Sequence, residues 1–214
     1  MTPAAPRGLW ITFEGGDGSG KTTQAERLRD ELEARGRRVV RTREPGGTEV
    51  GATLRELVLH HRGDLGPRAE ALLFAADRAH HVASTVRPAL ERGDVVIQDR
   101  YLDSSVAYQG AARALGASEV RDLSLWAVEG ALPDLTVLLD LDPAEARRRL
   151  DADDKPFDRL ETERAEFHER VRRAYLDLSQ AEPDRFLVID ATLPPDEIAA
   201  RILAEVRRRM PSLG

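Results

Sequence analysis

An eight-residue segment near the N-terminus, Gly15-Gly16-Asp17-Gly18-Ser19-Gly20-Lys21-Thr22, fits the pattern G-x-x-x-x-G-K-[ST]. The apolar run 9–13 before it predicts a buried strand, and the helical spacing of apolar residues over 22–35 predicts a helix after it. Between a strand and a helix, glycines let backbone N–H groups curl toward phosphate oxygens, and the helix presents its positive end. The segment therefore predicts an α/β fold that binds a nucleotide through its phosphates.

Apolar runs alternate with longer amphipathic stretches along the rest of the chain. Further strands are expected at 39–40, 95–97, 135–139 and 186–189. Helices are expected at 49–60, from Pro67 toward Leu90, from about Asp103, from Ser118 as an N-cap, from Asp142-Pro143, at 161–180 and from Pro195. Strands that are continuous apolar runs predict a parallel sheet covered on both faces. We expect about five strands in one domain, 9–214, after a short tail, 1–8.

Composition excludes several classes of protein. The net charge of −6 disfavours a partner that is a nucleic acid. The absence of cysteine excludes a disulfide scaffold and thiolate metal sites. No apolar run reaches the roughly 18 residues that a membrane-spanning helix needs, and the N-terminus has no signal-peptide pattern. The expected location is therefore the cytoplasm, without membrane association.

Residues at two strand ends indicate phosphoryl transfer. Lys21 can reach the β and γ phosphates of ATP, and Thr22 can hold Mg²⁺. The expected strand 95–97 leads into Asp99, a candidate metal ligand, and then into Arg100. ATP-hydrolysing proteins commonly have a glutamate at that next position, whereas arginine clamps a second phosphate. The sequence also has no N-K-x-D motif for guanine, so transfer to an acceptor is favoured over hydrolysis.

Several separated segments together resemble bacterial thymidylate kinases, over about Leu9 to Leu178. They are Phe13-Glu14-Gly15 through Thr23, Thr42-Arg43-Glu44-Pro45-Gly46-Gly47-Thr48, Leu73-Phe74-Ala75-Ala76-Asp77-Arg78, and Asp99-Arg100-Tyr101 through Gly110. The resemblance implies a P-loop kinase fold with a short mobile lid. It also implies transfer of the γ-phosphoryl group of ATP to dTMP, with Mg²⁺, for dTTP synthesis, and a homodimer.

The resemblance also assigns the acceptor site. Phe74 would stack on thymine, Arg78 would hydrogen-bond the base, and Tyr108 would crowd the 2′ position. The residues alone favour a core residue on a helix for Phe74, and they allow a solvated arginine for Arg78. The full set of dTMP-binding residues that the resemblance implies is Arg43, Phe74, Arg78, Arg100, Ser105, Tyr108 and Gln109.

The donor side follows from the loop and from the family pattern together. ATP is expected to bind Gly15, Gly16, Asp17, Gly18, Ser19, Gly20, Lys21, Thr22 and Arg149, with Thr22, Asp99 and Asp17 around the metal. The catalytic residues implied are Asp17, Lys21, Arg100 and Arg159.

Position 18 determines which part of the chain must supply a further positive charge for the transition state. One branch of the family has a basic residue in the loop, and the other supplies it from the lid. Because Gly18 is not basic, we expect it from a lid at about 147–160 that orders over ATP. The candidates are Arg147, Arg148, Arg149, Lys155 and Arg159. Arg159 best matches the family's lid pattern, whereas 147–149 is equally consistent with a solvated helix face.

Two alternative functions remain open from the sequence. Another nucleoside monophosphate kinase would share the loop and the lid, and a nucleotide-gated binding protein would hold ATP without transferring phosphate. Turnover of a panel of nucleoside monophosphates would separate them. The family pattern also predicts a cis peptide bond between Glu44 and Pro45, where cis bonds are about 5–6% of X–Pro bonds in general.

Overall fold

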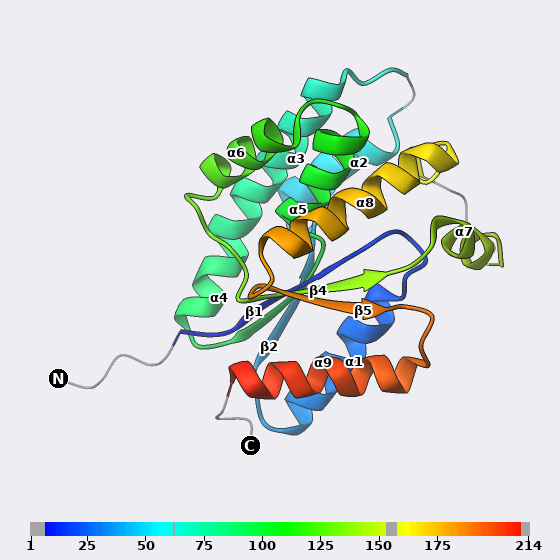
Figure 1. Cartoon of the computed structure of the whole chain (residues 1–214). Helices are drawn as coiled ribbons and strands as arrows, with labels where there is room; N and C mark the ends of the chain where they lie inside the picture. The colour runs from blue at the N-terminus through cyan, green and yellow to red at the C-terminus, as the bar shows by residue number, and fades with distance from the viewer. Residues whose placement is uncertain (1–6, 62, 153–157, 211–214) are drawn as a thin grey trace.

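The computed structural model describes residues 7–61, 63–152 and 158–210. At its centre is a five-stranded parallel sheet in the order β2-β3-β1-β4-β5 (Figure 1). The strands are β1 (Trp10–Glu14), β2 (Val39–Arg43), β3 (Val95–Asp99), β4 (Leu135–Asp140) and β5 (Phe186–Asp190). The central strands are buried apolar runs. This confirms the predicted α/β fold and its strand count.

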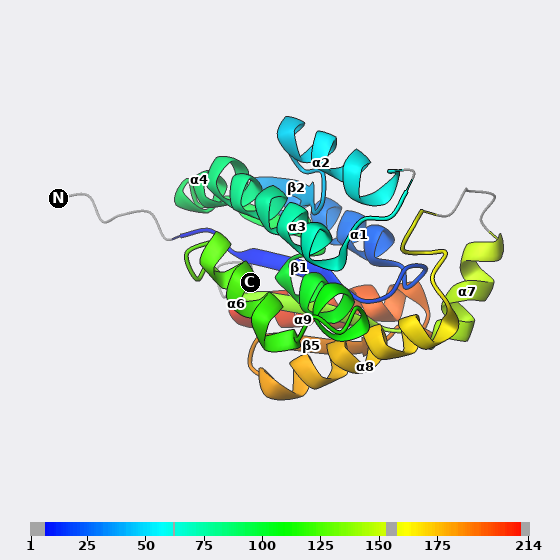
Figure 2. The same ribbon diagram turned by 90° about the horizontal axis from the view of Figure 1, so that it is seen from above.

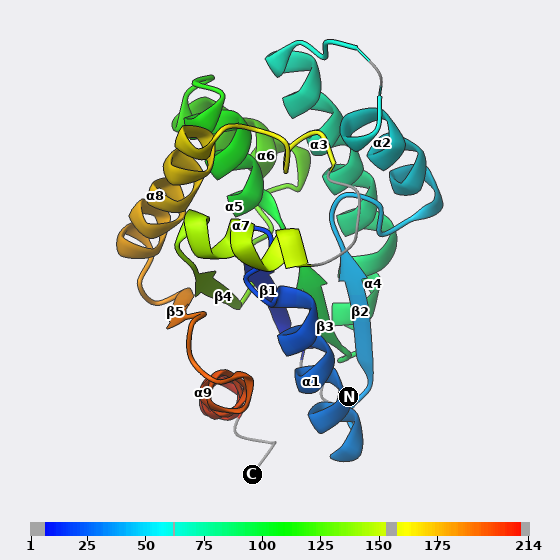
Figure 3. The same ribbon diagram turned by 90° about the vertical axis from the view of Figure 1, so that its right-hand side faces the viewer.

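One face of the sheet is covered by α1 (Lys21–Ala34) and α9 (Pro195–Arg209) (Figures 1 and 3). Ile11 and Phe13 of β1 pack in the same apolar cluster as Leu28 of α1 and Ile202 of α9. Successive side chains on a strand point to opposite faces, so Trp10 belongs to the cluster on the other side.

The other face is covered by a set of long and short helices. These are α3 (Pro67–His81), η1 (Val82–Val86), α4 (Arg87–Glu91), α5 (Leu102–Ser105), η2 (Val106–Ala112), α6 (Ala117–Ala127) and α8 (Ala165–Ala181). Here η1 and η2 are π-helical segments, and α2 (Glu49–Leu59) packs against α3, as Figure 2 shows. In the described part of the chain, no helix has the length and hydropathy to cross a membrane.

The functional residues predicted after the strands meet at one edge of the sheet. Phe13 and Arg43 both pair in register with Asp99, and Glu14 pairs with Leu138. In a parallel sheet the carboxyl ends lie together, and ligands bind there. Figure 3 looks onto this edge, with α7 (Pro143–Ala152) in front of it.

Two predicted helix starts were wrong. Helix α6 begins after Gly116, whose φ is 98°, and Ser118 lies inside it with its hydroxyl on Glu119. Helix α8 begins at Ala165 instead of Glu161. Asp158 Oδ1 accepts hydrogen bonds from the N–H groups of Leu160 and Glu161, a local turn that competes with helix.

Candidate active site

The predicted phosphate loop connects β1 to α1 at the carboxyl edge of the sheet. Gly15, Gly18 and Gly20 have φ values of 129°, 75° and 90°, which strain any residue with a side chain. A Cβ atom at Gly15 would lie 2.4 Å from the Leu139 carbonyl oxygen, and one at Gly18 would lie 2.9 Å from the Ala146 carbonyl oxygen. The loop therefore packs tightly against β4 on one side and α7 on the other.

Lys21 curls back over this loop from the first turn of α1. Its side chain is 7% exposed, and Nζ donates to the carbonyl oxygens of Gly15 (3.1 Å) and Gly16 (2.8 Å). Burial, followed by the charge of Arg100, lowers the pKa of Lys21. A charged phosphate oxygen is a stronger acceptor than these carbonyls, so the ammonium is poised to turn to it.

Thr22 and Asp99 are adjacent and fit a magnesium ion. Thr22 Oγ1 donates to Asp99 Oδ2 over 3.4 Å. Asp99 Oδ1 is buried and has no hydrogen-bond partner among the described residues, which is costly unless a ligand satisfies it. No group of three or more His, Cys, Asp or Glu side chains suited to a metal occurs in the described ranges. Mg²⁺ often uses one or two carboxylates together with phosphate oxygens and water, so this pair suffices.

Arg100 and Asp17 form an ion pair at the centre of the site. Arg100 Nη2 donates to Asp17 Oδ1 over 2.5 Å, and Nη1 donates to Ser104 Oγ (3.1 Å) and to the Tyr175 hydroxyl (3.3 Å). Burial acts to raise the pKa of Asp17, but the charges of Arg100 and Lys21 outweigh it and lower the pKa to about 2. Asp17 is therefore ionised near neutral pH. The structure thus brings Asp17, Lys21 and Arg100 together.

The backbone of Arg100 is in the left-handed region, at a φ of 64°. This costs a non-glycine residue about 1–2 kcal/mol, and such residues cluster at functional sites. Gln98 holds the conformation in place, because its Nε2 donates to the Arg100 carbonyl oxygen (2.9 Å). Gln98 Oε1 in turn accepts from Trp10 Nε1 (3.0 Å) in the buried sheet face.

A cavity next to Arg100 contains most of the predicted acceptor residues. It lies between α2, α3 and η2. Asp17 and Arg100 form the wall that it shares with the phosphate loop. Its wall includes Phe74, Arg78, Arg100, Ser105, Tyr108 and Gln109. The structure therefore brings together six of the seven dTMP-binding residues that the resemblance implies.

Arg78 is buried and fixed by three side chains. It is 2% exposed, and it donates to Glu44 Oε2 (3.0 Å), Ser124 Oγ (3.1 Å) and Ser105 Oγ (2.9 Å). It is therefore not the solvated arginine that the residues alone allowed. These bonds use three of the five guanidinium N–H groups, so the other two can present a fixed hydrogen-bonding edge to a base.

Glu44 supports Arg78 from behind and was missed by sequence reasoning. Its second oxygen, Oε1, bonds His81 Nδ1 (2.8 Å), and His81 Nε2 bonds Thr42 Oγ1 (2.6 Å). The Glu44–Pro45 peptide bond is cis, as predicted. Glu44 lies in the segment that carries the resemblance, yet only the fold shows that it faces Arg78, 34 residues away.

Tyr108 and Gln109 lie on η2 and are both buried. The Tyr108 hydroxyl donates to Asp17 Oδ2 (3.3 Å), and the Arg100 guanidinium lies 5.2 Å from the centre of its ring. Burial raises the pKa of Tyr108, so the phenol keeps its proton. Gln109 Nε2 donates to the buried carboxylate of Glu70 (2.8 Å). Gln109 is thus tied to α3 as well as facing the cavity.

Arg43, the seventh predicted acceptor residue, is exposed at the end of β2 and lies outside the described wall of the cavity. Arg55 of α2 lies in that wall instead, with Nη1 on the Pro45 carbonyl oxygen (3.0 Å). Burial, followed by the charges of Arg43 and other groups, lowers the pKa of Arg55. The two arginines therefore share one positive region, and no pattern in the sequence pointed to Arg55.

The lid arginines separate into two groups. Arg149 of α7 reaches the donor side: Nη1 lies 3.5 Å from the Gly18 carbonyl oxygen, and Nη2 donates to the Ala191 carbonyl oxygen (3.1 Å). Arg159 instead lies on the acceptor side. It donates to the Val58 carbonyl oxygen (3.0 and 2.9 Å) and pairs with Glu70.

Of the other lid candidates, Arg147 and Arg148 are exposed on α7, with Asp151 and Glu145 as ion-pair partners. Lys155 lies outside the described residues. The structure thus does not bring Arg159 to the phosphate loop, whereas Arg149 contacts the loop at the Gly18 carbonyl oxygen.

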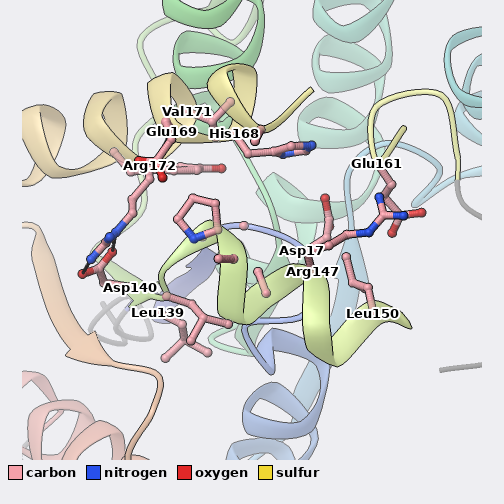
Figure 4. Close-up of a pocket in the computed structure, with 18 of the residues that line it drawn as sticks. Asp17, Leu139, Asp140, Arg147, Leu150, Glu161, His168, Glu169, Val171 and Arg172 are labelled. Carbon is pink, nitrogen blue, oxygen red and sulfur yellow. Dashed lines mark hydrogen bonds and ion pairs between the residues drawn. The ribbon is translucent and has the colours of Figure 1, made fainter. Parts of the chain in front are cut away.

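A second cavity of about 470 Å³ lies between α7 and α8 and opens onto the phosphate loop at Asp17 (Figure 4). In Figure 4, Leu139 and Leu150 form part of its apolar wall, while Arg172, paired with Asp140, and His168 lie toward α8. This cavity separates α7, which overlaps the start of the expected lid, from α8 beside the loop.

Comparison with known proteins agrees with the geometry. A family model described as thymidylate kinase matches residues 13–202. The chain is 68% identical over 197 residues to a thymidylate kinase from Clavibacter sepedonicus, covering 92% of this chain and 93% of that protein. It is 66% identical to one from Leifsonia xyli subsp. xyli (97% and 99% covered) and 51% identical to one from Deinococcus radiodurans (95% and 98% covered).

Proposed function

This chain belongs to the thymidylate kinase family, and we propose that its residues at the phosphate loop and the acceptor cavity transfer the γ-phosphoryl group of ATP to dTMP, giving dTDP and ADP. The observation that carries the proposal is the Asp17–Arg100 pair. Asp17 belongs to the loop and Arg100 lines the acceptor cavity. Arg100 Nη2 donates to Asp17 Oδ1 over 2.5 Å, so the pair connects the two sites. A phosphoryl group would have to pass this pair on its way between the nucleotides.

On the donor side, the loop 15–22 would bind the phosphates of ATP. Lys21 would bind the β and γ phosphates in place of the Gly15 and Gly16 carbonyls. Arg149, which lies between Gly18 and Ala191, would contact the phosphates of ATP. Mg²⁺ would be held at Thr22 and Asp99, where it would neutralise charge on the phosphates; Asp17, occupied by Arg100, is the weaker candidate ligand.

On the acceptor side, Phe74 would stack on thymine and Arg78 would hydrogen-bond its edge. Their burial and fixed contacts make a preorganised pocket, which limits the entropy lost when a base is bound. Tyr108 would restrict the space at the 2′ position of the sugar. The phosphate of dTMP would meet Arg100, with Arg43 and Arg55 adding positive charge.

The transfer itself needs no covalent intermediate with the protein. An oxygen of the dTMP phosphate attacks the γ phosphorus, that P–O bond forms, and the bond from the γ phosphorus to the bridging oxygen breaks to release ADP. Lys21 and Arg100 would stabilise charge on the transferring group, because both are desolvated and fixed before the reaction. Asp17 would keep Arg100 aligned between the two nucleotides.

Two further parts of the assignment are proposals. The lid, about 147–160, would close over ATP, with Arg149 or Arg159 on the phosphates. A homodimer is supported by two exposed apolar side chains on neighbouring helices, Trp126 of α6 (81% exposed) and Leu72 of α3 (56% exposed). Large apolar side chains exposed to this degree are candidate contacts of a subunit interface. A cytoplasmic location stays a prediction.

An acceptor panel tests the proposed function. ADP release is measured with ATP, Mg²⁺ and, in turn, dTMP, dUMP, AMP, GMP and CMP. We expect dTMP to give the highest kcat/KM, and Phe74→Ala to reduce turnover of dTMP more than basal ATP hydrolysis. Equal turnover of a purine monophosphate, or ADP release that does not depend on any acceptor, would contradict the assignment.

A further inference from the structure

Glu14, the last residue of β1, is a fully buried carboxyl group beside the catalytic arginine. Its Oε1 accepts from the backbone N–H groups of Tyr101 (2.7 Å) and Ser104 (3.3 Å). Its Oε2 accepts from the hydroxyls of Ser104 (2.6 Å) and Tyr175 (2.9 Å). Neither direct substrate contact nor metal binding explains a carboxyl group enclosed in this way.

Glu14 Oε2, Ser104 Oγ and the Tyr175 hydroxyl oxygen form a closed triangle. Ser104 Oγ and the Tyr175 hydroxyl are 2.8 Å apart, so the triangle has three hydrogen-bond contacts, of 2.6, 2.8 and 2.9 Å. The two hydroxyls supply only two protons. If Glu14 is ionised, one contact brings two oxygen lone pairs together. A third proton on Glu14 Oε2 satisfies all three contacts, because each oxygen then donates once and accepts once.

The triangle is what holds one edge of Arg100. Nη1 of Arg100 donates to Ser104 Oγ (3.1 Å) and to the Tyr175 hydroxyl (3.3 Å), while Nη2 is on Asp17. Both hydroxyls must offer lone pairs to Nη1. A neutral Glu14 leaves their lone pairs in a fixed direction, whereas an anion would draw both O–H groups onto itself and pull the guanidinium toward its own charge.

Charged and titratable groups on the neighbouring elements affect the ionisation of Glu14. Asp103 of α5 disfavours its ionisation, whereas Arg100 and Lys21 favour it; Tyr108 and Tyr175 face it with phenols whose pKa values are raised by burial. Burial, followed by Asp103, raises the pKa of Glu14 to about 7. Desolvation thus outweighs the nearby positive charges, which agrees with the proton that the triangle requires.

We propose that Glu14 is a positioning residue for Arg100, and that it acts as a neutral carboxylic acid that closes the hydrogen-bonded triangle with Ser104 and Tyr175. The triangle connects β1, α5 and α8, so it fixes the guanidinium relative to both the phosphate loop and the helix that follows the lid. Loss of the proton from Glu14 pulls the guanidinium out of its alignment with the two hydroxyls and lowers kcat, while dTMP and ATP still bind. This proposal rests on the proposed transfer to dTMP.

The test is the pH profile of kcat for the full chain with ATP, Mg²⁺ and dTMP, in wild type and in Glu14→Gln. If only the protonated form is competent, wild-type kcat falls by about tenfold per pH unit above the pKa of Glu14. Glutamine is neutral at every pH and keeps a donor at this position, so Glu14→Gln should lack this fall, with unchanged KM values. Ser179→Ala is the matched control for Tyr175→Phe, because both remove a buried hydroxyl from α8. Only Tyr175→Phe should lower kcat.

Thermal unfolding gives a readout that does not depend on catalysis. The pKa of Glu14 is raised from its ordinary value of 4.5 to about 7, so its contribution to stability is present below pH 4.5 and is lost as the pH rises through 7. The Tm of Glu14→Gln relative to wild type should therefore increase from pH 5 to pH 8. If the variant does not fold, NMR of wild-type protein with ¹³C-labelled glutamate carboxyls should still show one carboxyl titrating near 7.

Three results would overturn the proposal. They are a Glu14→Gln variant with the wild-type pH profile, a variant with low kcat at every pH, and wild-type glutamates that all titrate near their ordinary value. Failure of the proposed function is distinguishable from all three, because wild type would then show no turnover that depends on dTMP.

Discussion

Phe74 contacts both the acceptor cavity and the protein core. Its ring lines the cavity, is 8% exposed, and belongs to the same apolar cluster as Leu59 and Tyr108. Phe74→Leu keeps most of the apolar volume but removes the flat aromatic face, whereas Phe74→Ala removes both. The pair of substitutions therefore separates base stacking from core packing, the two interpretations that the sequence left open.

The size of each effect follows from its cause. Stacking on an aromatic side chain contributes about 1–3 kcal/mol per base, so we expect Phe74→Leu to raise KM for dTMP by about 5- to 150-fold. KM for ATP should not change, because the phosphate loop does not touch this ring. Phe74→Ala adds a cavity that costs about 3–5 kcal/mol of folding free energy. At about 2–4 °C per kcal/mol for a chain of this size, its Tm should fall by about 6–20 °C.

The assay couples ADP release to a spectroscopic signal, with each substrate varied at saturating concentrations of the other, and thermal unfolding is recorded for the same samples. Phe167→Leu is the control: Phe167 lies in the same cluster and packs edge-on against Tyr108, with ring centres 6.0 Å apart, outside the described cavity wall. Unchanged KM for dTMP in Phe74→Leu, together with lost stability in Phe74→Ala, would refute stacking and make Phe74 a core residue only.

Other parts of the site give independent predictions. Lys21→Ala should lower kcat by about 10²–10³-fold or more without altering the circular dichroism spectrum, because it removes a charge aimed at the transferring group; a variant that keeps more than a tenth of the wild-type rate would contradict that role. Arg149→Ala should raise KM for ATP, and Arg159→Ala should lower kcat with little change in KM for dTMP, as expected for an interaction made in the transition state. Wild-type kinetics in both variants would exclude a lid arginine from the mechanism. Trp126→Asp should convert the proposed dimer into a monomer in light scattering, and an unchanged mass would place the interface elsewhere.

The fold was predictable because its signals are local. The central strands β1, β3 and β4 contain buried apolar runs, and each main helix has its own apolar spacing and start or stop residue, as Pro67 and Pro195 illustrate. The errors came where a side chain or a glycine changed the backbone over a few residues. The turn at Asp158 makes α8 begin later in the chain than predicted, and α6 begins directly after Gly116 instead of at Ser118. The π-helical segments give no periodic signal that separates them from α-helix.

The candidate site was predictable where a motif carried it and not where it depends on long-range contacts. Asp17 and Lys21 lie in the phosphate-loop motif, and Phe74 lies in a segment that the family resemblance identifies. Glu14 acts on partners 90 and 161 residues away, and its role depends on a proton count that only the folded oxygens define. Arg55 was missed for a similar reason, because α2 brings it to the cavity from an ordinary amphipathic helix.

Gly18 has a consequence for how relatives of this chain can vary. The absence of a side chain there lets α7 approach the loop, since a Cβ atom would lie 2.9 Å from the Ala146 carbonyl oxygen, and φ is 75°. The same close approach brings Arg149 to the loop. A loop arginine at position 18 and a tightly seated α7 are therefore mutually exclusive on steric grounds. Positions 18 and 149 should covary among homologues, and grafting a basic residue into this loop alone should displace the lid helix instead of adding a second charge.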